Sequence, residues 1–471
     1  MMRSKGLLNG RSIIVAGAGL AGLTAAVELD NNGARVTVLE ARDRVGGRVW
    51  TVRDRFDEDQ HAEAGGDLIE SDHEAIRRLA DQLGLSLSPI LRGGFAFVRR
   101  GSAQHAHKPA PSVRGLWSRI AKLCEPWVQA YRLSEQRWDG PIARTLARLS
   151  VAEWLDHIHA DRQTRALMQG LRGFFLADPE DLSLLALVDQ LATDTPGPGQ
   201  FYRVMGGNDR LATGLAAMLR EPVNLRTIVL AVAQSRDKVR VTVSTPEGDQ
   251  RQIIADYLVL AVPATTLRHI AFRPPLQLLQ RQAIQSLQYG HATKTLLQFD
   301  RRFWQRRGRP RAYGTELLIG AIWDGNEEQR GRAGILTLLA GGSASTATRK
   351  LISNRGVQGL VEALEWLGAI QTTVLASRMV CWEDDPLAQG GYAYFDPAYD
   401  PEFRMWLARP HGRIVFAGEH TSLRWQGYMN GAVESGLRAA AEVQAMLWQS
   451  RRGRPLARIV HDGSPQPHAS R

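Results

Sequence analysis

The pattern of apolar and polar positions over the first forty residues predicts a strand, a helix and a second strand. Residues Ser12–Ala16 form a short, β-branched apolar run, which is typical of a buried parallel strand. A glycine-rich turn, Gly17–Gly22, follows it, and a helical pattern then continues to Gly33. A second apolar run, Ala34–Leu39, leads directly to the acidic residue Glu40. The chain therefore begins with a strand-turn-helix-strand unit.

The residue types in this unit are those that bind a dinucleotide. Gly17 permits the tight turn, Gly19 lets a pyrophosphate approach the backbone, and Gly22 lets the helix pack closely on the strand. The helix N-terminus adds free N–H groups and a partial positive charge. Glu40 can accept hydrogen bonds from both ribose hydroxyls of an adenine nucleotide. Because an acid at this position disfavours a 2′-phosphate, we expect FAD or NAD in preference to NADP.

A second glycine turn directly after Glu40 favours FAD over NAD. It consists of Gly46 and Gly47, and Arg48 follows it. A flavin dinucleotide lies extended across its domain and needs a further close approach of the backbone, while the arginine can supply charge to the pyrophosphate. The alternative interpretation is a surface loop with solvated arginines. Gly65 and Gly66 form another glycine pair at which the backbone could come close to the cofactor.

The rest of the chain alternates helical and strand patterns. Residues 109–193 are mostly helical, and Ser150 with Glu153 predicts a capping box. The pair Asp178-Pro179 predicts a helix N-cap followed by proline at the first helical position. Residues 195–199 predict a linker. Further helices are expected at about 72–84, 208–220 and 431–447, strands at 223–232, 238–245, 256–262, 289–300, 332–340 and 413–417, and an irregular aromatic segment at 382–395.

Composition narrows the class of protein. The length of 471 residues indicates two or three domains, and 44% hydrophobic with 23% charged residues is ordinary globular composition. The net charge of +11 could suit nucleic acid, but the arginines are spread without a stacking or zinc-finger pattern, so we expect no nucleic-acid partner. Two cysteines, Cys124 and Cys381, favour a reduced, cytoplasmic setting and exclude a four-thiolate metal site. No apolar run reaches the roughly 18–20 residues of a membrane span.

Four segments together resemble the flavin-containing amine oxidase family, which includes monoamine, polyamine and L-amino-acid oxidases. They follow the family order over nearly the whole chain, and the last is the most specific. The segments are Val15–Gly22 with Glu40 and Gly46–Arg48, then Tyr289–Trp304, Trp382–Tyr394 and Phe416–Gly436.

This resemblance implies an α/β fold with an α+β insert. A discontinuous Rossmann-like FAD-binding domain would carry an inserted substrate domain made of helices and a mixed sheet. The expected boundaries are 1–84, 205–288 and 412–450 for the FAD-binding parts, 85–204 and 289–411 for the helical and sheet parts of the substrate domain, and 451–471 for a disordered tail.

The resemblance also implies which residues hold FAD. The first glycine turn would hold the ADP half, the backbone of Val229 would face the adenine, and Glu419 would bind a ribityl hydroxyl. Met429 and the helix N-terminus near Gly431 would meet the isoalloxazine ring, where the helix dipole offsets negative charge. The expected set is Gly17, Ala18, Gly19, Leu20, Ala21, Gly22, Glu40, Ala41, Arg42, Gly47, Arg48, Gly65, Gly66, Asp67, Val229, Gly418, Glu419, Gly427, Met429, Gly431 and Ala432. No metal is expected.

Four residues match positions that act on the substrate in the family. Lys294 matches the lysine that holds a water near flavin N5, although a lysine in an apolar strand could equally lie at a sheet edge. Tyr392 and Tyr428 match the two aromatic rings that flank the amine and favour cationic character at its nitrogen. Trp382 also keeps its family place. The alternative for both tyrosines is a half-buried position in the core.

Departures from the family pattern bear on cofactor and substrate. Gly391 stands where covalent monoamine oxidases have a cysteine, so we expect FAD to be bound non-covalently. L-amino-acid oxidases place an arginine soon after the Gly-Gly pair to clamp the substrate carboxylate. Here Asp67 and Glu70 occupy that stretch, which would repel a carboxylate and suit a cation if they line the site. The C-terminal membrane helix of mitochondrial monoamine oxidases has no counterpart.

The sequence therefore predicts an FAD-dependent oxidase of small-molecule amines. The carbon next to nitrogen would give a hydride to flavin N5, the imine would hydrolyse, and O2 would be reduced to hydrogen peroxide. Alternatives are an L-amino-acid oxidase, a related FAD-dependent desaturase or dehydrogenase of the same fold, and a flavoprotein that serves mainly as an assembly partner. A homodimer is possible. Pocket shape would come mostly from residues 95–191 and 315–324, which carry no motif.

Overall fold

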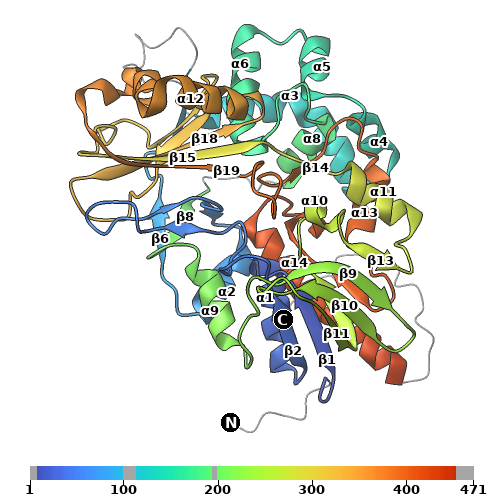
Figure 1. Ribbon diagram of the computed structural model, residues 1–471. Coiled ribbons are helices and arrows are strands. Elements are labelled where there is room, and N and C mark those ends of the chain that lie inside the picture. Colours follow the sequence, from blue (N-terminus) through green and yellow to red (C-terminus); the bar gives the residue numbers. More distant parts are fainter. Residues whose placement is uncertain (1–7, 99–112, 194–198, 452–471) are drawn as a thin grey trace, which may run out of the picture.

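The computed structural model describes residues 8–98, 113–193 and 199–451. A four-stranded parallel sheet joins three distant parts of the chain (Figure 1). Its strands are short apolar runs that are mostly buried, because both faces of the sheet are covered. In spatial order they are β2 (Arg35–Leu39), β1 (Ser12–Ala16), β12 (Tyr257–Leu260) and β21 (Ile414–Phe416).

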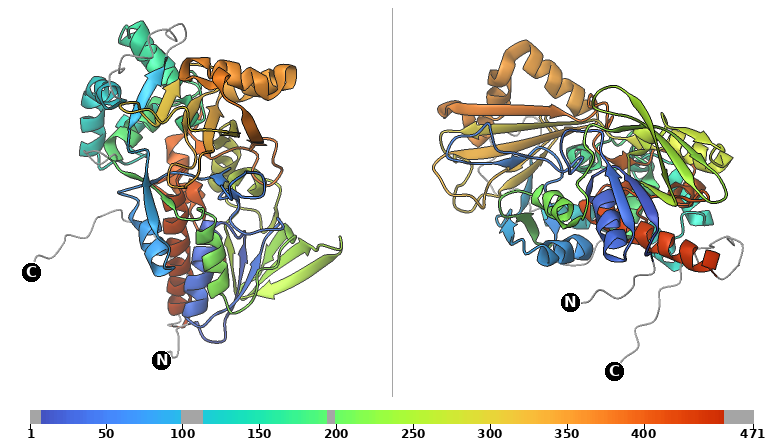
Figure 2. Two further views of the ribbon diagram at one scale, coloured as in Figure 1. Left: turned by 90° about the vertical axis from the view of Figure 1, so that its left-hand side faces the viewer. Right: turned by 60° about the horizontal axis from the view of Figure 1, so that its bottom comes forward.

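Helices pack on one face of this sheet, and a second sheet lies on its other side (Figure 2). The first helix is buried nearly all round because it packs between the strands and two other helices. The helices are α1 (Leu20–Asn31), α2 (Glu74–Gln82), α9 (Arg210–Met218) and α14 (Met429–Arg451). The second sheet has the order β11 (Gln250–Ala255), β10 (Val239–Ser244), β9 (Ile228–Gln234) and β13 (Ala271–Arg273), with α10 (Ala264–Leu267) and α11 (Leu278–Ser286) after β12.

A six-stranded mixed sheet forms the opposite part of the molecule. Its apolar face packs against α12 (Ser343–Ala363), which lies along β15 and β18 (Figure 1). The strands in spatial order are β19 (Val374–Cys381), β15 (Ala292–Phe299), β18 (Gly334–Gly341), β17 (Ala321–Asp324), β16 (Ala312–Thr315) and β7 (Phe95–Val98). Two 3₁₀ turns, η2 (Glu365–Leu367) and η3 (Ala369–Gln371), follow the helix.

Short helices and small sheets fill the space between these layers. The helices are α3 (Val113–Leu133), α4 (Pro141–Ala147), α5 (Val151–His157), α6 (Arg162–Gly170), α7 (Arg172–Phe175), α8 (Leu184–Thr193), α13 (Arg404–Leu407), η4 (Pro401–Phe403) and η5 (Glu419–Thr421). The small sheets pair β3 (Thr51–Val52) with β4 (Ala62–Glu63), β14 (Gln288–Tyr289) with β20 (Ala393–Tyr394), and β8 (Phe201–Val204) with both β5 (Ile69–Glu70) and β6 (Leu87–Ile90).

The fold class expected from the sequence is confirmed, and so is the capping box at the start of α5. The Ser150 hydroxyl accepts from the Glu153 amide at 3.1 Å, and the Glu153 carboxylate accepts from the Ser150 amide at 2.8 Å. The predicted domain boundaries stay predictions. The linker at 195–198 and the tail at 452–471 lie outside the described residues.

The prediction of a helix N-cap at Asp178 is wrong. Residues after it form turns, and the next helix, α8, begins only at Leu184. The Asp178 carboxylate instead accepts hydrogen bonds from the amide of Ser343 at 2.7 Å and from its hydroxyl at 3.0 Å. A distant partner at the start of α12 therefore takes the side chain that would have capped a local helix.

The strand predicted at 223–232 is shorter than expected. Asn224 bridges to Leu39 beside the first sheet, and the backbone then turns at Arg226, where φ is +52°. The regular strand β9 begins only at Ile228. The segment that was predicted as one strand therefore contributes to two sheets, first beside β2 and then as β9.

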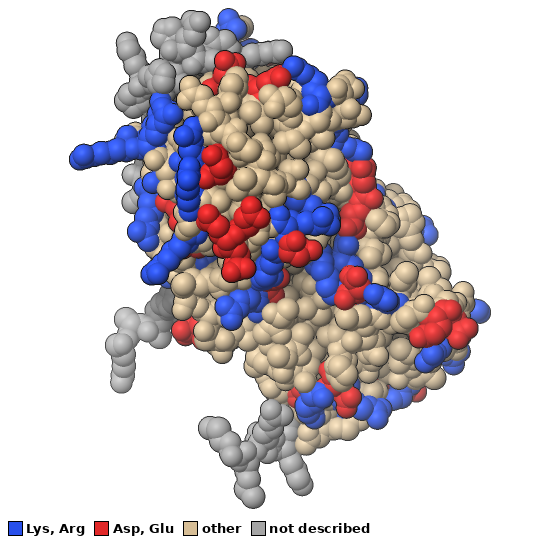
Figure 3. Space-filling view, turned by 60° about the vertical axis from the view of Figure 1, so that its left-hand side comes forward, with Lys and Arg blue, Asp and Glu red and all other residues tan. Residues whose placement is uncertain are grey.

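The described surface carries charges of both signs. On the face shown in Figure 3, lysine and arginine side chains lie among aspartates and glutamates. Exposed arginines are paired in several places, among them Arg355 with Glu362 at 2.6 Å. Within residues 8–98, 113–193 and 199–451, none of the helices is both long and apolar enough to cross a membrane.

Candidate active site

A cavity of about 740 Å³ lies between the parallel sheet, the six-stranded sheet and helices α7 and α8. Most residues that the sequence singled out line this cavity, although they come from every part of the chain. They are Gly17, Gly19, Leu20, Ala21, Glu40, Ala41, Arg42, Gly47, Arg48, Gly65, Gly66, Asp67, Val229, Lys294, Trp382, Tyr392, Gly418, Glu419, Gly427, Tyr428, Met429 and Ala432. Ala18, Gly22 and Gly431 do not line it and have packing roles instead.

The turn between β1 and α1 has the shape of a phosphate cradle. Gly17 has φ of +102°, and a Cβ there would lie 2.6 Å from the carbonyl oxygen of Ala261. A Cβ at Gly22 would lie 1.9 Å from the carbonyl oxygen of Gly17, so only glycine lets α1 pack on this turn. Gly19 is different, because a Cβ there would meet nothing within 4 Å. The space above Gly19 and the N-terminus of α1 is therefore free for a phosphate.

Glu40 closes one side of this cradle from the end of β2. Its Oε2 accepts from the amide of Ala18 at 2.7 Å, and its Oε1 accepts from the amide of Arg42 at 2.8 Å. These two bonds fix a buried carboxylate at the cavity wall. Arg42 in turn makes a two-pronged ion pair with Asp385, at 2.7 and 2.8 Å. The cradle is thus held in place from both sides, and its donor set fits the ribose and pyrophosphate of FAD.

A buried ion pair joins the N-terminal and C-terminal parts of the site. Arg48 donates to Glu419 Oε1 at 2.9 Å and to the carbonyl of Gly391 at 2.8 Å. The amide of Gly427 donates to the other carboxylate oxygen of Glu419 at 3.1 Å. Burial alone would lower the pKa of Arg48, but Glu419 and Tyr289 raise it above its ordinary value. Arg48 therefore stays a fixed positive charge on the cavity wall.

Lys294 projects into the cavity from β15, a strand of the six-stranded sheet. This strand lies inside the six-stranded sheet, between β19 and β18, so the interpretation as an edge-strand lysine is wrong. The side chain is only 3% exposed. Its Nζ donates to the carbonyl of Gly65 at 2.9 Å and to Asp67 Oδ2 at 3.0 Å, and it lies 5.2 Å from the ring centre of Trp323. The partner that a buried lysine needs is therefore Asp67.

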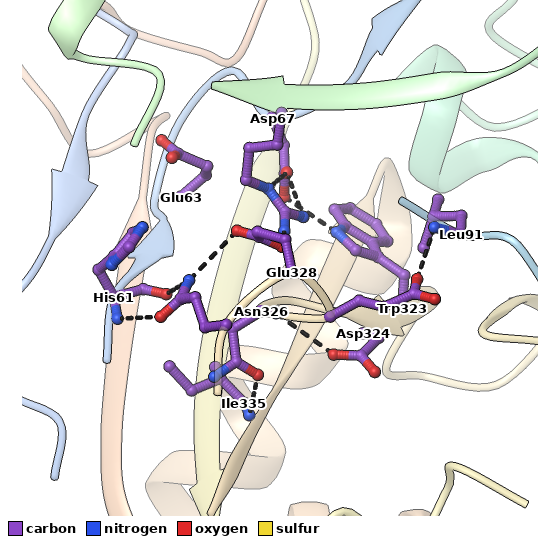
Figure 4. A network of polar contacts seen from close by, with 12 residues as sticks. His61, Glu63, Asp67, Leu91, Trp323, Asp324, Asn326, Glu328 and Ile335 are labelled. Atoms are coloured by element: carbon purple, nitrogen blue, oxygen red, sulfur yellow. Dashed lines mark hydrogen bonds and ion pairs between the residues drawn. The ribbon is translucent and has the colours of Figure 1, made fainter. Parts of the chain in front are cut away.

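Asp67 belongs to a buried cluster that the sequence did not predict. Its Oδ1 accepts from Arg203, and its Oδ2 accepts from Lys294 and from Trp323 Nε1 at 2.9 Å. Arg203 also pairs with Glu328 at 2.6 Å. Figure 4 shows the bond between Asp67 and Trp323, with Glu328 in the same network. We call these five residues the Asp67 cluster. The sequence did contain a signal that could have identified Arg203 as a buried charge. It is a lone charge in the apolar strand β8, as Lys294 is in β15.

The two expected cage tyrosines and Trp382 come from adjacent loops. The hydroxyl of Tyr392 donates to the carbonyl of Phe174, and its ring packs on Gly427, where a Cβ would lie 3.2 Å away. Tyr428 packs edge-on against His73, with ring centres 5.1 Å apart. Trp382 donates from Nε1 to the carbonyl of Ala64 at 3.0 Å. All three rings line the cavity that Lys294 also reaches.

The remaining lining includes an apolar wall and a second acid that the sequence did not predict. The wall combines Leu171, Phe174, Phe175, Leu176, Phe201, Trp323 and Leu339, partly from the two segments expected to shape the pocket. Asp189 on α8 is half-buried at the cavity, and the hydroxyl of Tyr131 donates to it at 2.7 Å. Burial raises the pKa of Asp189 above its ordinary value.

Comparison with known proteins places this chain in a family. The sequence model described as flavin containing amine oxidoreductase matches residues 20–444. AofH of Mycobacterium tuberculosis, which is named after the flavin-containing monoamine oxidases, is 31% identical over 460 residues, or 92% of this chain and 97% of AofH. The L-amino-acid oxidase of Siganus canaliculatus is 28% identical over 466 residues, or 92% of this chain and 85% of that protein. The structure of cyclohexylamine oxidase from Brevibacterium oxydans shares the fold, with a TM-score of 0.80 at 23% identity over 93% of this chain and 99% of that one. The chain belongs to the family of flavin-containing amine oxidoreductases, which use FAD.

Proposed function

We propose that this flavin-dependent amine oxidase acts on small-molecule amines with O2 as the electron acceptor and releases hydrogen peroxide. The observation that carries the proposal is that Lys294, Tyr392 and Tyr428 line the same cavity as the glycine-rich cradle. FAD, when bound, would supply the acceptor for a hydride equivalent from the carbon next to the amine nitrogen, and water would hydrolyse the imine product to a carbonyl compound and ammonia or a smaller amine.

The residues of this chain supply position and charge for that chemistry. The rings of Tyr392 and Tyr428 would hold the amine between two π-faces, which stabilise positive charge as it develops at the nitrogen. The apolar wall around Phe174 would exclude bulk water, and exclusion of water strengthens every electrostatic interaction in the site. Lys294 would hold a water at the cavity wall. No side-chain base is needed if the amine binds in its neutral form.

We also propose that FAD is bound without a covalent bond. Gly391 stands where covalent relatives have cysteine, and a Cβ there would already meet Leu176 at 2.4 Å. Both cysteines of the chain, Cys124 and Cys381, are free and do not line the cavity. Acid precipitation should therefore release all of the flavin into the supernatant, whereas flavin that stays with the precipitate would contradict this proposal. Cytoplasmic location and a homodimer stay predictions.

The role of the cage is tested by Tyr428→Ala. Loss of one π-face should lower kcat/KM for amines by about 10- to 100-fold, while FAD content stays unchanged. Tyr428→Phe keeps the ring and is the matched control, which should retain most of the activity. Equal kinetics in the wild type and the alanine variant would mean that Tyr428 is simply part of the core.

An L-amino-acid oxidase is the second candidate function. One sequence observation disfavours it, because Asp67 and Glu70 follow the Gly-Gly pair where such enzymes carry a carboxylate-binding arginine. Both acids line the cavity, but Lys294 and Arg203 already balance the charge of Asp67. The charge of Asp67 therefore gives no hint of a cationic substrate.

Product analysis separates these candidates. Purified enzyme would be incubated in air with arylalkylamines, cyclic amines, diamines and L-amino acids. We expect equal amounts of peroxide and carbonyl product from one class of amine and no turnover of L-amino acids. Turnover of L-amino acids alone would establish the second candidate. Absence of peroxide with every compound would contradict both and favour a desaturase or dehydrogenase of the same fold.

A further inference from the structure

The carboxylate of Asp67 is saturated with donors and therefore rigid. Arg203 binds Oδ1 through Nε at 2.8 Å and through its terminal nitrogen at 2.7 Å. Oδ2 accepts from Lys294 Nζ and from Trp323 Nε1, at 3.0 and 2.9 Å. Because donors hold both oxygens, the plane of the carboxylate is fixed as well as its position. The carboxylate is thus held by Arg203 of β8 at one oxygen and by Trp323 of β17 at the oxygen that faces Lys294, so the lysine does not have to hold it.

The charges of the Asp67 cluster cancel. Asp67 and Glu328 are the acids, and Arg203 and Lys294 are the bases, all with side chains at most 4% exposed. Burial would raise the pKa of Asp67, but Arg203 and Lys294 hold it below its ordinary value. Glu63 also faces the cluster, and burial together with the charge of Asp67 raises its pKa to about 7. The cluster therefore supports one buried ammonium without leaving a net charge.

Lys294 depends on this arrangement for its own charge. Burial lowers the pKa of Lys294, and the charge of Asp67 is the largest influence that opposes the loss of the proton. Within the described residues, two of the three N–H groups of the ammonium have partners, the carbonyl of Gly65 and Asp67. One N–H group is left for the cavity that Lys294 lines.

We propose that Asp67 is the positioning residue for Lys294, which it holds as a cation at one place on the cavity wall, anchored in turn by Arg203 and Trp323. This inference rests on the proposed role of Lys294 in the oxidase reaction and assigns to Asp67 no contact with FAD. The expectation that Asp67 binds the cofactor stays a prediction. It also explains why an acid can stand at the cavity wall without binding a substrate cation.

The direct test follows the charge of Lys294 itself. The chain has only six lysines, so protein labelled with ¹³C at the lysine ε-carbon gives few NMR signals, and Lys294→Met assigns the one of interest. In the wild type, this signal should be that of an ammonium at pH 7 and should change to that of a neutral amine only at higher pH. In Asp67→Asn it should change to that of a neutral amine at least about one pH unit lower. Identical titration in both proteins would overturn the proposal, and so would a neutral Lys294 in the wild type at pH 7.

Three further variants serve as checks on this test. In Asp67→Asn, Glu63 could ionise in place of Asp67, so Glu63→Gln combined with Asp67→Asn should shift the titration further. Asp324→Asn is the matched control, because Asp324 is an equally buried acid on the same strand as Trp323 and does not contact Lys294. It should leave the signal of Lys294 unchanged. If Asp67→Asn does not fold, Trp323→Phe removes one anchor without changing any charge and should lower the pH of the transition by a smaller amount.

A kinetic readout that uses no amine separates this inference from the proposed function. Flavin reduced with dithionite is mixed with air-saturated buffer, and its reoxidation is followed. Asp67→Asn should reoxidise at least about tenfold more slowly than the wild type at pH 8 and approach it at pH 6. The double variant with Lys294→Met should equal Lys294→Met alone, because Asp67 acts through the lysine. If amines reduce the wild type but this profile is unchanged, the role of Asp67 is wrong. If no amine reduces the wild type and the NMR shift is present, the proposed function is wrong and the role of Asp67 as anchor stands.

Discussion

Lys294→Met should bind FAD as the wild type does but react with oxygen about 100-fold more slowly after reduction. The ammonium is buried at the cavity wall and is held by Gly65 and Asp67, so its charge acts in a medium that screens little. Methionine has a similar length and no charge, and it leaves Asp67 with Arg203 and Trp323 as partners. The measurement is stopped-flow reoxidation of the reduced protein, with the FAD content determined in the same preparation.

Lys238→Met is the matched control for this loss of charge. Lys238 pairs with Asp256 at 3.1 Å, is about half exposed and does not line the cavity, so reoxidation should keep its wild-type rate. Wild-type kinetics in Lys294→Met would remove the lysine from the mechanism. Loss of FAD in the same variant would assign Lys294 to cofactor binding.

Gly19→Leu should give a folded protein without FAD. Gly19 has an ordinary negative φ of −74°, and a Cβ there meets nothing within 4 Å, so the backbone tolerates a side chain. The leucine would project into the space that the cradle keeps for a phosphate. We expect the affinity for FAD to fall by at least about tenfold, with an unchanged circular dichroism spectrum of the apoprotein. Titration of apoprotein with FAD, followed by flavin fluorescence, measures this effect.

Two other glycine variants show whether the effect comes from the cradle. Gly19→Ala fills less of the space and should weaken FAD binding less than the leucine does. Gly22→Ala should instead lower the stability of the whole fold, because its Cβ would lie 1.9 Å from the carbonyl oxygen of Gly17, and overpacking costs about 1–3 kcal/mol. Full FAD occupancy in Gly19→Leu would mean that the cofactor does not approach the N-terminus of α1.

The sequence predicted those parts of the fold whose signals are local. The turn from β1 to α1 and the capping box of α5 depend on residues within a few positions of one another, and both are present. The helix α12 has no such signal, because its apolar residues do not follow a helical period and Gly356 interrupts it with φ of +60°. Strands β16 and β19 likewise pair with β7 and β15, which are distant from them in the sequence.

The candidate site likewise has a part that the sequence predicted and a part that it did not. Lys294 was predicted because a lysine in an apolar strand stands out and matches a family position. Its partner set was not predicted, because Asp67 lies 227 residues from Lys294, 136 from Arg203 and 256 from Trp323. A buried charge in a strand indicates that a partner exists, but only the fold shows which residue it is. Asp67 was therefore recognised as a site residue, but its partners were not predicted.

The central claim is that an amine gives its electrons directly to the flavin of this protein. The purified enzyme would be mixed without oxygen with arylalkylamines, polyamines and L-amino acids in turn, while the flavin absorption band is followed. We predict rapid bleaching by one class of amine, and formation of hydrogen peroxide when air is readmitted. A yellow protein whose flavin no amine bleaches would contradict amine oxidation, although the cofactor and the fold would stand.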